Sequence, residues 1–249
     1  MFRFSFLLIG LLIISGCTTS RVQNYERASA LNTELGLAYL IKGSYEQALK
    51  KLKKAIKQNP DNAKPYSYIA ELYRRLNENE LAEDYFNQAL DVDPNDASIN
   101  NNYGAYLCAN KEYDKAFKFF KIALKNPVYS GRGEVFENIG LCSESQGNIK
   151  IARDNYVKAI SIDPNLSKSL LAVALIDFDA QKVDSAHKYI RYYNKVAKAT
   201  PQSLWLEILI AKKNNDTKTI KSLSWSLNAK FPKSKEAKLL KRLIDSGEI

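Results

Sequence analysis

The chain has 249 residues, of which 45% are hydrophobic, with 10 glycines and 7 prolines. This composition fits one sizeable folded domain and excludes a low-complexity or linker-rich protein. The formal net charge of +10 allows attraction to anionic lipid or to an acidic partner, and a single histidine leaves little for histidine-dependent catalysis.

The first sixteen residues have the pattern of an export signal. Arg3 gives a positive flank, and the apolar run over residues 4–14 is too short for a permanent membrane span. Residues 14–17, Ile-Ser-Gly-Cys, then resemble the lipobox of bacterial lipoproteins. That resemblance implies that Cys17 is lipidated, and Thr18 behind it implies sorting to the outer membrane, on its periplasmic face. The alternative is a plain signal peptide with a chance cysteine.

Residues 17–28 are polar and lack a helical apolar stripe, so we expect a lipidated N-terminus and a short tether. A folded domain over residues 29–249 is expected to follow.

A helix–turn–helix unit over residues 63–96 is the clearest element of that domain. Tyr66 and Ala70 lie on one face of a first helix, and Ala82 and Phe86 on one face of a second. Pro94 ends the second helix. The small alanines allow close helix approach. One such hairpin cannot bury its apolar faces alone, so copies must stack.

Copies of the unit recur with a period of about 34 residues. The predicted repeats cover residues 29–62, 63–96, 97–132, 133–166, 167–203 and 204–234, followed by a cap at 235–249. The fifth repeat has Asp177 where an aromatic residue is usual. The pattern resembles tetratricopeptide repeats. It implies an all-α, right-handed superhelical solenoid of about six helix–turn–helix repeats with a C-terminal capping helix.

Few residues could carry catalysis. His187 has no nucleophile or other metal ligand at a suitable spacing, and there is no glycine-rich phosphate loop. We therefore expect no enzyme activity, no catalytic residue, no metal, no cofactor and no small-molecule substrate. If the export signal is real, nucleic acid is excluded as a partner.

The two remaining cysteines fall in the first helices of repeats three and four. An exported protein meets an oxidising compartment, and adjacent helices bring such residues near each other. The repeat positions differ, however: Cys108 is expected to point toward the inner groove and Cys142 toward the hairpin core. Because a bridge requires Cα atoms within about 7 Å, we expect two buried thiols rather than a disulfide.

A tetratricopeptide solenoid offers a concave groove lined by its first helices, and this groove suits a peptide. Positions that face inward in the family are here Leu37, Leu40, Ile41, Glu71, Arg74, Arg75, Asn101, Ala105, Cys108, Glu137, Leu141, Glu144, Leu171, Leu175 and Phe178. Asn102 and Asn138 occupy positions at which some members hold a peptide backbone. The apolar sets of repeats one and five are candidate docking sites. Alternatively, the N-terminal segment covers repeat one.

Five lysines lie close together in the second helix of repeat one, at positions 50, 51, 53, 54 and 57. A solvated face is the simpler interpretation, and contact with lipid headgroups is the alternative because the lipid tether is near.

A narrower resemblance covers nearly the whole chain. A lipobox precedes about six repeats, the third repeat contains Asn-Asn-Tyr-Gly at 101–104, and the fourth contains Val-Phe-Glu-Asn-Ile-Gly-Leu at 135–141. These features resemble the type IV pilus biogenesis lipoproteins that act as secretin pilotins. The resemblance implies binding of secretin subunits and their delivery to the outer membrane. Alternatives are an adaptor for outer-membrane protein assembly or protease recruitment, or a peptidoglycan-associated protein.

Overall fold

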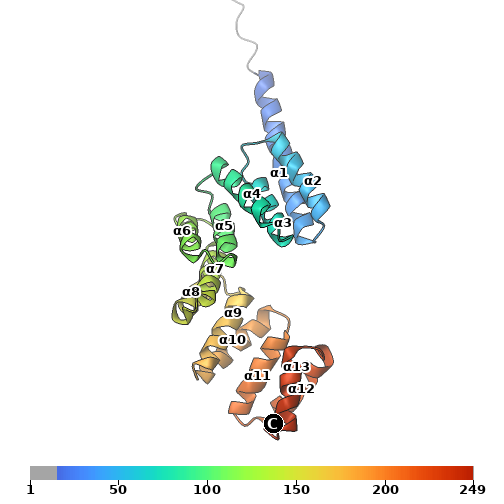
Figure 1. Cartoon of the computed structure of the whole chain (residues 1–249), viewed down its shortest axis with the longest axis vertical. Coiled ribbons are helices and arrows are strands. Elements are labelled where there is room, and N and C mark those ends of the chain that lie inside the picture. Colours follow the sequence, from blue (N-terminus) through green and yellow to red (C-terminus); the bar gives the residue numbers. More distant parts are fainter. Residues whose placement is uncertain (1–15, 249) are drawn as a thin grey trace, which may run out of the picture. The chain divides into compact units, whose positions relative to one another are not determined.

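The structure is a computed structural model that describes the backbone of residues 16–248 and the side chains of residues 22–248. This part of the chain is all α, with thirteen helices and no strand (Figure 1). The expected export signal lies outside it except for Gly16. The helices are α1 Gly16–Ile41, α2 Tyr45–Gln58, α3 Lys64–Arg75, α4 Asn79–Val92, α5 Ala97–Ala109, α6 Tyr113–Ala123, α7 Arg132–Ser145, α8 Ile149–Ile162, α9 Ser167–Asp179, α10 Val183–Val196, α11 Pro201–Lys213, α12 Thr217–Lys230 and α13 Lys235–Asp245.

The chain divides into two compact units, Met1–Asn102 and Tyr103–Ile249, and the division falls within α5. The first unit holds α1 to α4 and the start of α5. The second holds the rest of α5 and the helices up to α13. Each unit is built from helix pairs, so the predicted helical repeat architecture is confirmed.

The turn inside each helix pair is made in the same way. One residue adopts a positive φ, and the backbone N–H after it donates to a carbonyl in the last turn of the first helix, at 2.8–3.0 Å. This pattern is the Schellman motif, which ends a helix by satisfying its free carbonyls. The positive-φ residues are Gly43, Asn77, Lys111, Gly147, Gln181 and Asn215. The turn therefore repeats although its sequence does not.

The second helix of a pair buries a recurring set of residues in the core. It buries small residues one turn on either side of a larger one, as with Ala82, Phe86 and Ala89 in α4. Gly140 of α7 lies so close to Tyr156 of α8 that a Cβ atom on the glycine would come within 2.6 Å of the ring. This spacing explains why small and large residues alternate between facing helices.

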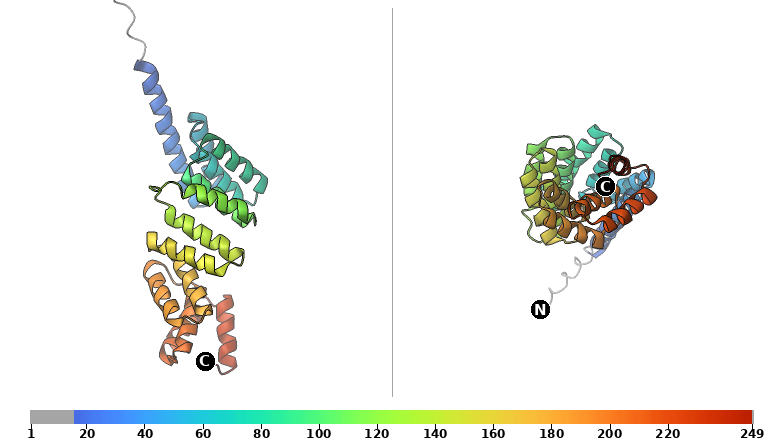
Figure 2. Two further views of the ribbon diagram at one scale, coloured as in Figure 1. Left: turned by 90° about the vertical axis from the view of Figure 1, so that its left-hand side faces the viewer. Right: turned by 90° about the horizontal axis from the view of Figure 1, so that it is seen from below.

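The first helix begins earlier than expected. Helix α1 starts at Gly16, so residues 16–28 form a helical extension, the α1 extension, rather than an irregular tether. Ser29 Oγ donates to the carbonyl of Ala55 at 2.9 Å, and Asn32 Nδ2 donates to Gln58 Oε1 at 2.8 Å. These contacts place the end of α2 beside residues 29–32, and the α1 extension continues beyond it (Figure 2). Because the extension continues α1, its described part does not fold back over Leu37 or Ile41.

Asp177, which replaces the usual aromatic residue in the fifth repeat, is buried in an ion pair. Its carboxylate accepts from Arg153 Nε at 2.5 Å, from Arg153 Nη2 at 2.8 Å and from Ser185 Oγ at 2.6 Å. Burial alone raises the pKa of Asp177, but the hydrogen bonds from Arg153 and Ser185 outweigh it and hold that pKa below its usual value. A polar network thus replaces an apolar contact between α8, α9 and α10.

Candidate functional site

Within residues 22–248 there is no group of three histidine, cysteine or acidic side chains arranged to hold a metal ion. His187 is exposed on α10, in a shallow polar hollow lined by Asp184, Lys188 and Arg191 of the same helix. None of the described helices combines the length and the apolar character needed to cross a membrane. The candidate site is a surface hollow beside a disulfide of the second unit.

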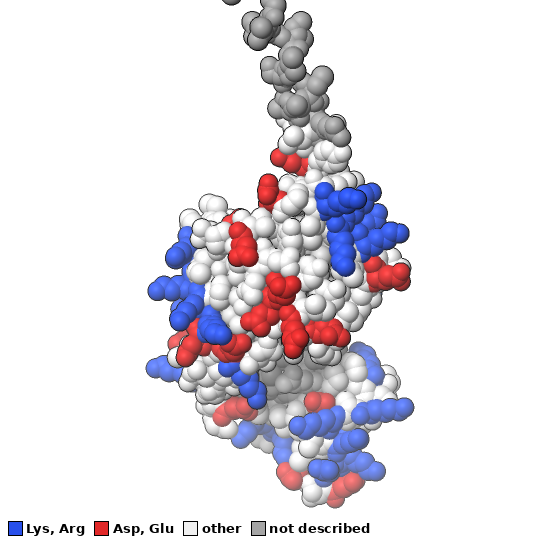
Figure 3. Space-filling view, turned by 45° about the horizontal axis from the view of Figure 1, so that its top comes forward, with Lys and Arg blue, Asp and Glu red and all other residues white. Residues whose placement is uncertain are grey.

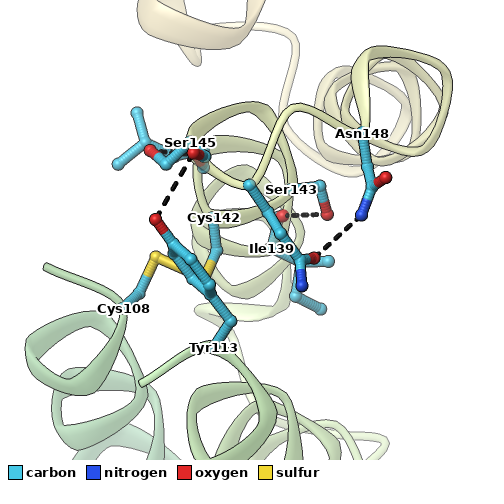
Figure 4. The surroundings of a disulfide bond; sticks show 9 residues. Cys108, Tyr113, Ile139, Cys142, Ser143, Ser145 and Asn148 are labelled. Atoms are coloured by element: carbon cyan, nitrogen blue, oxygen red, sulfur yellow. Dashed lines mark hydrogen bonds between the residues drawn. A yellow bond between two sulfur atoms is a disulfide. The ribbon is translucent and has the colours of Figure 1, made fainter. Parts of the chain in front are cut away.

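Cys108 of α5 and Cys142 of α7 form a disulfide, so the expectation of two free thiols was wrong (Figure 4). Their Cα atoms are 5.7 Å apart, and both side chains are buried. Side chains at the same repeat position point in the same direction from successive first helices. Two cysteines that face each other must therefore come from different repeat positions, and these two do.

A hollow of about 410 Å³ lies beside the disulfide in the second unit. Tyr113 at the start of α6 closes one side, and its hydroxyl donates to the carbonyl of Ser145 at 3.3 Å (Figure 4). Leu141 remains 51% exposed. The hollow is lined by Ala105, Cys108, Ala109, Lys111, Tyr113, Asn138, Leu141 and Ser145.

Two of the predicted groove residues, Asn138 and Leu141, thus meet in one hollow, together with Ala105 and Cys108. The walls combine small side chains, one exposed leucine, one tyrosine and one amide, with Lys111 as the only charged one among the described lining residues. This chemistry suits an apolar side chain of a peptide rather than a charged small molecule.

Two predicted groove carboxylates of α7 are held by other residues. Glu137 Oε2 accepts from the Ser169 backbone N–H at 3.2 Å and from Ser169 Oγ at 2.8 Å, which ties α7 to α9. Glu144 Oε2 accepts from the Tyr156 hydroxyl at 2.7 Å. Burial of Tyr156, together with this hydrogen bond, raises the pKa of its hydroxyl. Both glutamates therefore help to hold the helices together.

Repeat one presents a smaller apolar surface than the sequence suggested. Leu40 is only 1% exposed and packs against Ala48 and Leu72, so it belongs to the core. It lies one turn after Gly36, where α1 faces its neighbours, which accounts for its burial. Leu37 is half-buried, and Ile41 is 69% exposed.

Helix α3, which packs beside α1 in the first unit, contributes charged side chains to this surface. Glu71 accepts from Arg74 Nε at 2.6 Å and from Arg75 Nε at 2.8 Å, and Arg75 Nη1 donates to the carbonyl of Leu40 at 3.2 Å. Burial acts to raise the pKa of Glu71, but its bonds to the two arginines lower that pKa overall. The surface next to Ile41 therefore carries charged side chains that are paired with each other.

The asparagines of α5 lie inside the first unit. Asn101 is buried, and Asn102 is half-buried with its Nδ2 3.5 Å from Ser67 Oγ. The apolar groove positions of α9 are half-buried and pack on a cluster around Leu170 and Ile190. These positions are Leu171, Leu175 and Phe178.

Sequence reasoning missed the disulfide and the role of Tyr113 in closing the hollow. The placement of the two cysteines in successive first helices indicated that they are neighbours, but the rotation of each helix about its axis had to come from the structure. For Tyr113 we find no such signal, since its contact is with a backbone carbonyl of the next repeat.

Comparison with known proteins identifies the repeats. Models of the tetratricopeptide repeat match residues 69–128 and 133–166, and a model of the TPR repeat matches residues 36–77. The type IV pilus assembly protein PilF of Pseudomonas aeruginosa is 30% identical over 230 residues, which cover 90% of this chain and 91% of PilF.

Two solved structures are similar over most of the chain. The structure of Pseudomonas aeruginosa PilF has a TM-score of 0.81 and 28% identity and covers 88% of this chain and 99% of its own. That of PilW, described as a widely conserved type IV pilus biogenesis factor, has a TM-score of 0.73 and 28% identity and covers 87% of this chain and 98% of its own. Both relatives are thus matched along almost their entire length.

Proposed function

Because the chain belongs to the family of the type IV pilus assembly protein PilF, we propose that it is a pilotin. In this role it is an outer-membrane lipoprotein that binds secretin subunits and promotes their localisation and assembly in that membrane. The observation that carries the proposal is the similarity to PilF over nine-tenths of both chains. A tetratricopeptide fold is suited to holding protein partners rather than to catalysis.

The N-terminal sequence supports the membrane part of the proposal. Cys17 follows an apolar segment in a lipobox-like sequence and lies in the first turn of α1. Its acylation would anchor the chain stably, since several acyl chains hold a protein on a membrane where one does not. The α1 extension would then keep the repeats away from the point of attachment, by about 18 Å at 1.5 Å per residue.

The disulfide supports residence outside the cytosol. Buried disulfides form and persist in oxidising compartments, of which the bacterial periplasm is one. The Cys108–Cys142 bond joins α5 to α7 behind the hollow, so it would also fix the wall on which a secretin segment binds.

The exposed apolar residues on the first helices are the proposed contacts for secretin. Ile41 in the first unit and Leu141 in the second are the most exposed of the predicted apolar positions. Exposed aliphatic side chains are covered at little cost when a partner binds, and they supply most of the favourable free energy of such contacts.

The test is to replace these residues by glutamate and to measure how much secretin reaches the outer membrane. Ile41→Glu and Leu141→Glu should leave the fold intact because both side chains already lie at the surface, and each should reduce secretin localisation several-fold. Val128→Glu is the matched control, since Val128 is 87% exposed in the loop between α6 and α7. Normal secretin localisation in both groove variants would remove these residues from the binding surface.

A further inference from the structure

The outward face of α2 carries four exposed lysines at helical spacing. Lys50, Lys53, Lys54 and Lys57 lie three, four and seven positions apart and share one side of the helix. The opposite side is the buried one, formed by Ala48, Leu52 and Ala55. We name the four residues the lysine face, and Figure 3 shows the basic patch that it forms.

The charge of the lysine face is not neutralised within the protein. Among residues 22–248, none of the four lysines forms an ion pair with a carboxylate. Glu46 stands one turn before Lys50 on the same side, and it too makes no such pair. Like charges three and four residues apart repel each other and destabilise a helix. A negatively charged surface outside the protein would attract the four lysines and offset their mutual repulsion.

The register between α1 and α2 places the lysine face near the anchor. Ser29 contacts Ala55, and Asn32 contacts Gln58, so Lys54 and Lys57 lie at the end of α2 from which the α1 extension leads to Cys17. Lys54 and Lys57 therefore lie at the end of the helix pair nearest to Cys17, and Lys50 and Lys53 continue the same face away from it.

The α1 extension has an apolar side that faces the same way. Val22 and Tyr25 are exposed, and they precede Ser29 by seven and four residues. At 3.6 residues per turn these three share one side of α1, which is the side on which α2 packs. Viewed from α1, the exposed apolar pair and the lysine face thus point in the same direction.

From this arrangement we propose that the lysine face rests on the anionic phospholipid surface of the membrane that holds the acylated Cys17. Val22 and Tyr25 point toward that surface from the α1 extension, about 10 Å, one helix diameter, farther from it than the lysine face. Because salt screens charges beyond about 8 Å, α1 and α2 must lie along the membrane for the lysines to be attracted. The inference rests on the proposed lipidation and adds a defined orientation to it.

The test uses the mature chain with Cys17→Ser, so that no acyl chain contributes to binding. Sedimentation with phosphatidylcholine vesicles, with and without phosphatidylglycerol, measures the charge-dependent affinity. Replacing all four lysines of the face by glutamine should weaken binding to the anionic vesicles by about tenfold or more, given the contribution of each lysine near such a surface. Replacing them by arginine should preserve it.

A charge-matched control separates the lysine face from net charge. Lys218, Lys221, Lys238 and Lys241 are exposed on α12 and α13, and their replacement by glutamine removes the same charge. This control should bind like the parent chain, and thermal unfolding of every variant confirms its fold. Equal weakening in both glutamine variants, or no dependence of the parent on phosphatidylglycerol, would overturn the proposal. Neither readout involves acylation or secretin, so failure here is distinguishable from failure of the proposed pilotin function.

Discussion

At the scale of single residues, the buried pair of Asp177 and Arg153 shows how the chain tolerates a charge inside a repeat. The Asp177 side chain is fully buried, whereas the Arg153 side chain is 27% exposed and reaches solvent. Two hydrogen bonds from the guanidinium and one from Ser185 satisfy the carboxylate. A buried charge is retained at modest cost only when it is paired in this way.

Asp177→Asn should destabilise the protein at neutral pH by about 2 kcal/mol, the usual range for hydrogen bonds to a charged group. The folded pKa of Asp177 is lowered, so its contribution to stability is present above the unfolded value of about 3.9 and is lost as the pH falls through the folded pKa. The difference between the parent and the variant in the urea unfolding midpoint should therefore shrink from pH 7 to pH 3.

Asp179→Asn is the matched control for this prediction. Asp179 lies on the same helix but is exposed, and its replacement should change the midpoint little at either pH. An Asp177→Asn effect that is the same at pH 3 and pH 7 would show that the charge of Asp177 does not stabilise the fold.

At the scale of elements, the helix pairs differ in how well their sequence suits the shared turn. Gly43 and Gly147 adopt positive φ without strain because they lack a Cβ atom. Lys111 has a φ of 65° in the equivalent place, where an L side chain is strained. The turn between α5 and α6 is therefore held by its surroundings rather than by local preference.

Lys111→Gly should stabilise the protein by about 1 kcal/mol, because the strain of the left-handed residue is relieved. Lys118→Gly, at an exposed helical position of α6, should destabilise it by a similar amount because glycine is unfavourable inside a helix. Thermal or urea unfolding of the two variants should move in opposite directions. A shift in the same direction for both would exclude turn strain at Lys111.

The helix pairs were predicted well because the small and large residues that recur at helical spacing are the side chains that each pair buries. Ala82, Phe86 and Ala89 are all fully buried, as their spacing indicated. The α1 extension was missed because only Val22 and Tyr25 are large apolar residues there, too few to form a helical stripe. Leu40 was placed at the surface because repeat position alone does not tell which neighbours cover a side chain.

The disulfide illustrates the same limit between elements. The pattern within one repeat assigns each residue to a face of its own helix. Whether Cys108 and Cys142 meet depends on the distance between α5 and α7 and on the rotation of each helix about its axis. The longer loop before α7 changes the rotation of α7 relative to α5. Contacts between repeats therefore require the structure.

At the scale of the whole molecule, the proposed pilotin function separates recognition from membrane anchoring within one chain. The repeats of both units offer exposed apolar residues on first helices, and the N-terminal helix leads to a cysteine suited to acylation. The proposed function requires both recognition of a secretin by the repeats and its delivery by the lipid. Loss of either should leave the other intact.

The most direct measurement is separation of inner and outer membranes from cells that lack this chain, followed by quantification of secretin in each. The wild-type chain should restore secretin to the outer membrane, whereas Cys17→Ser, produced at the same level, should bind secretin but fail to deliver it. Secretin that reaches the outer membrane equally well without this chain, or with Cys17→Ser, would contradict the account.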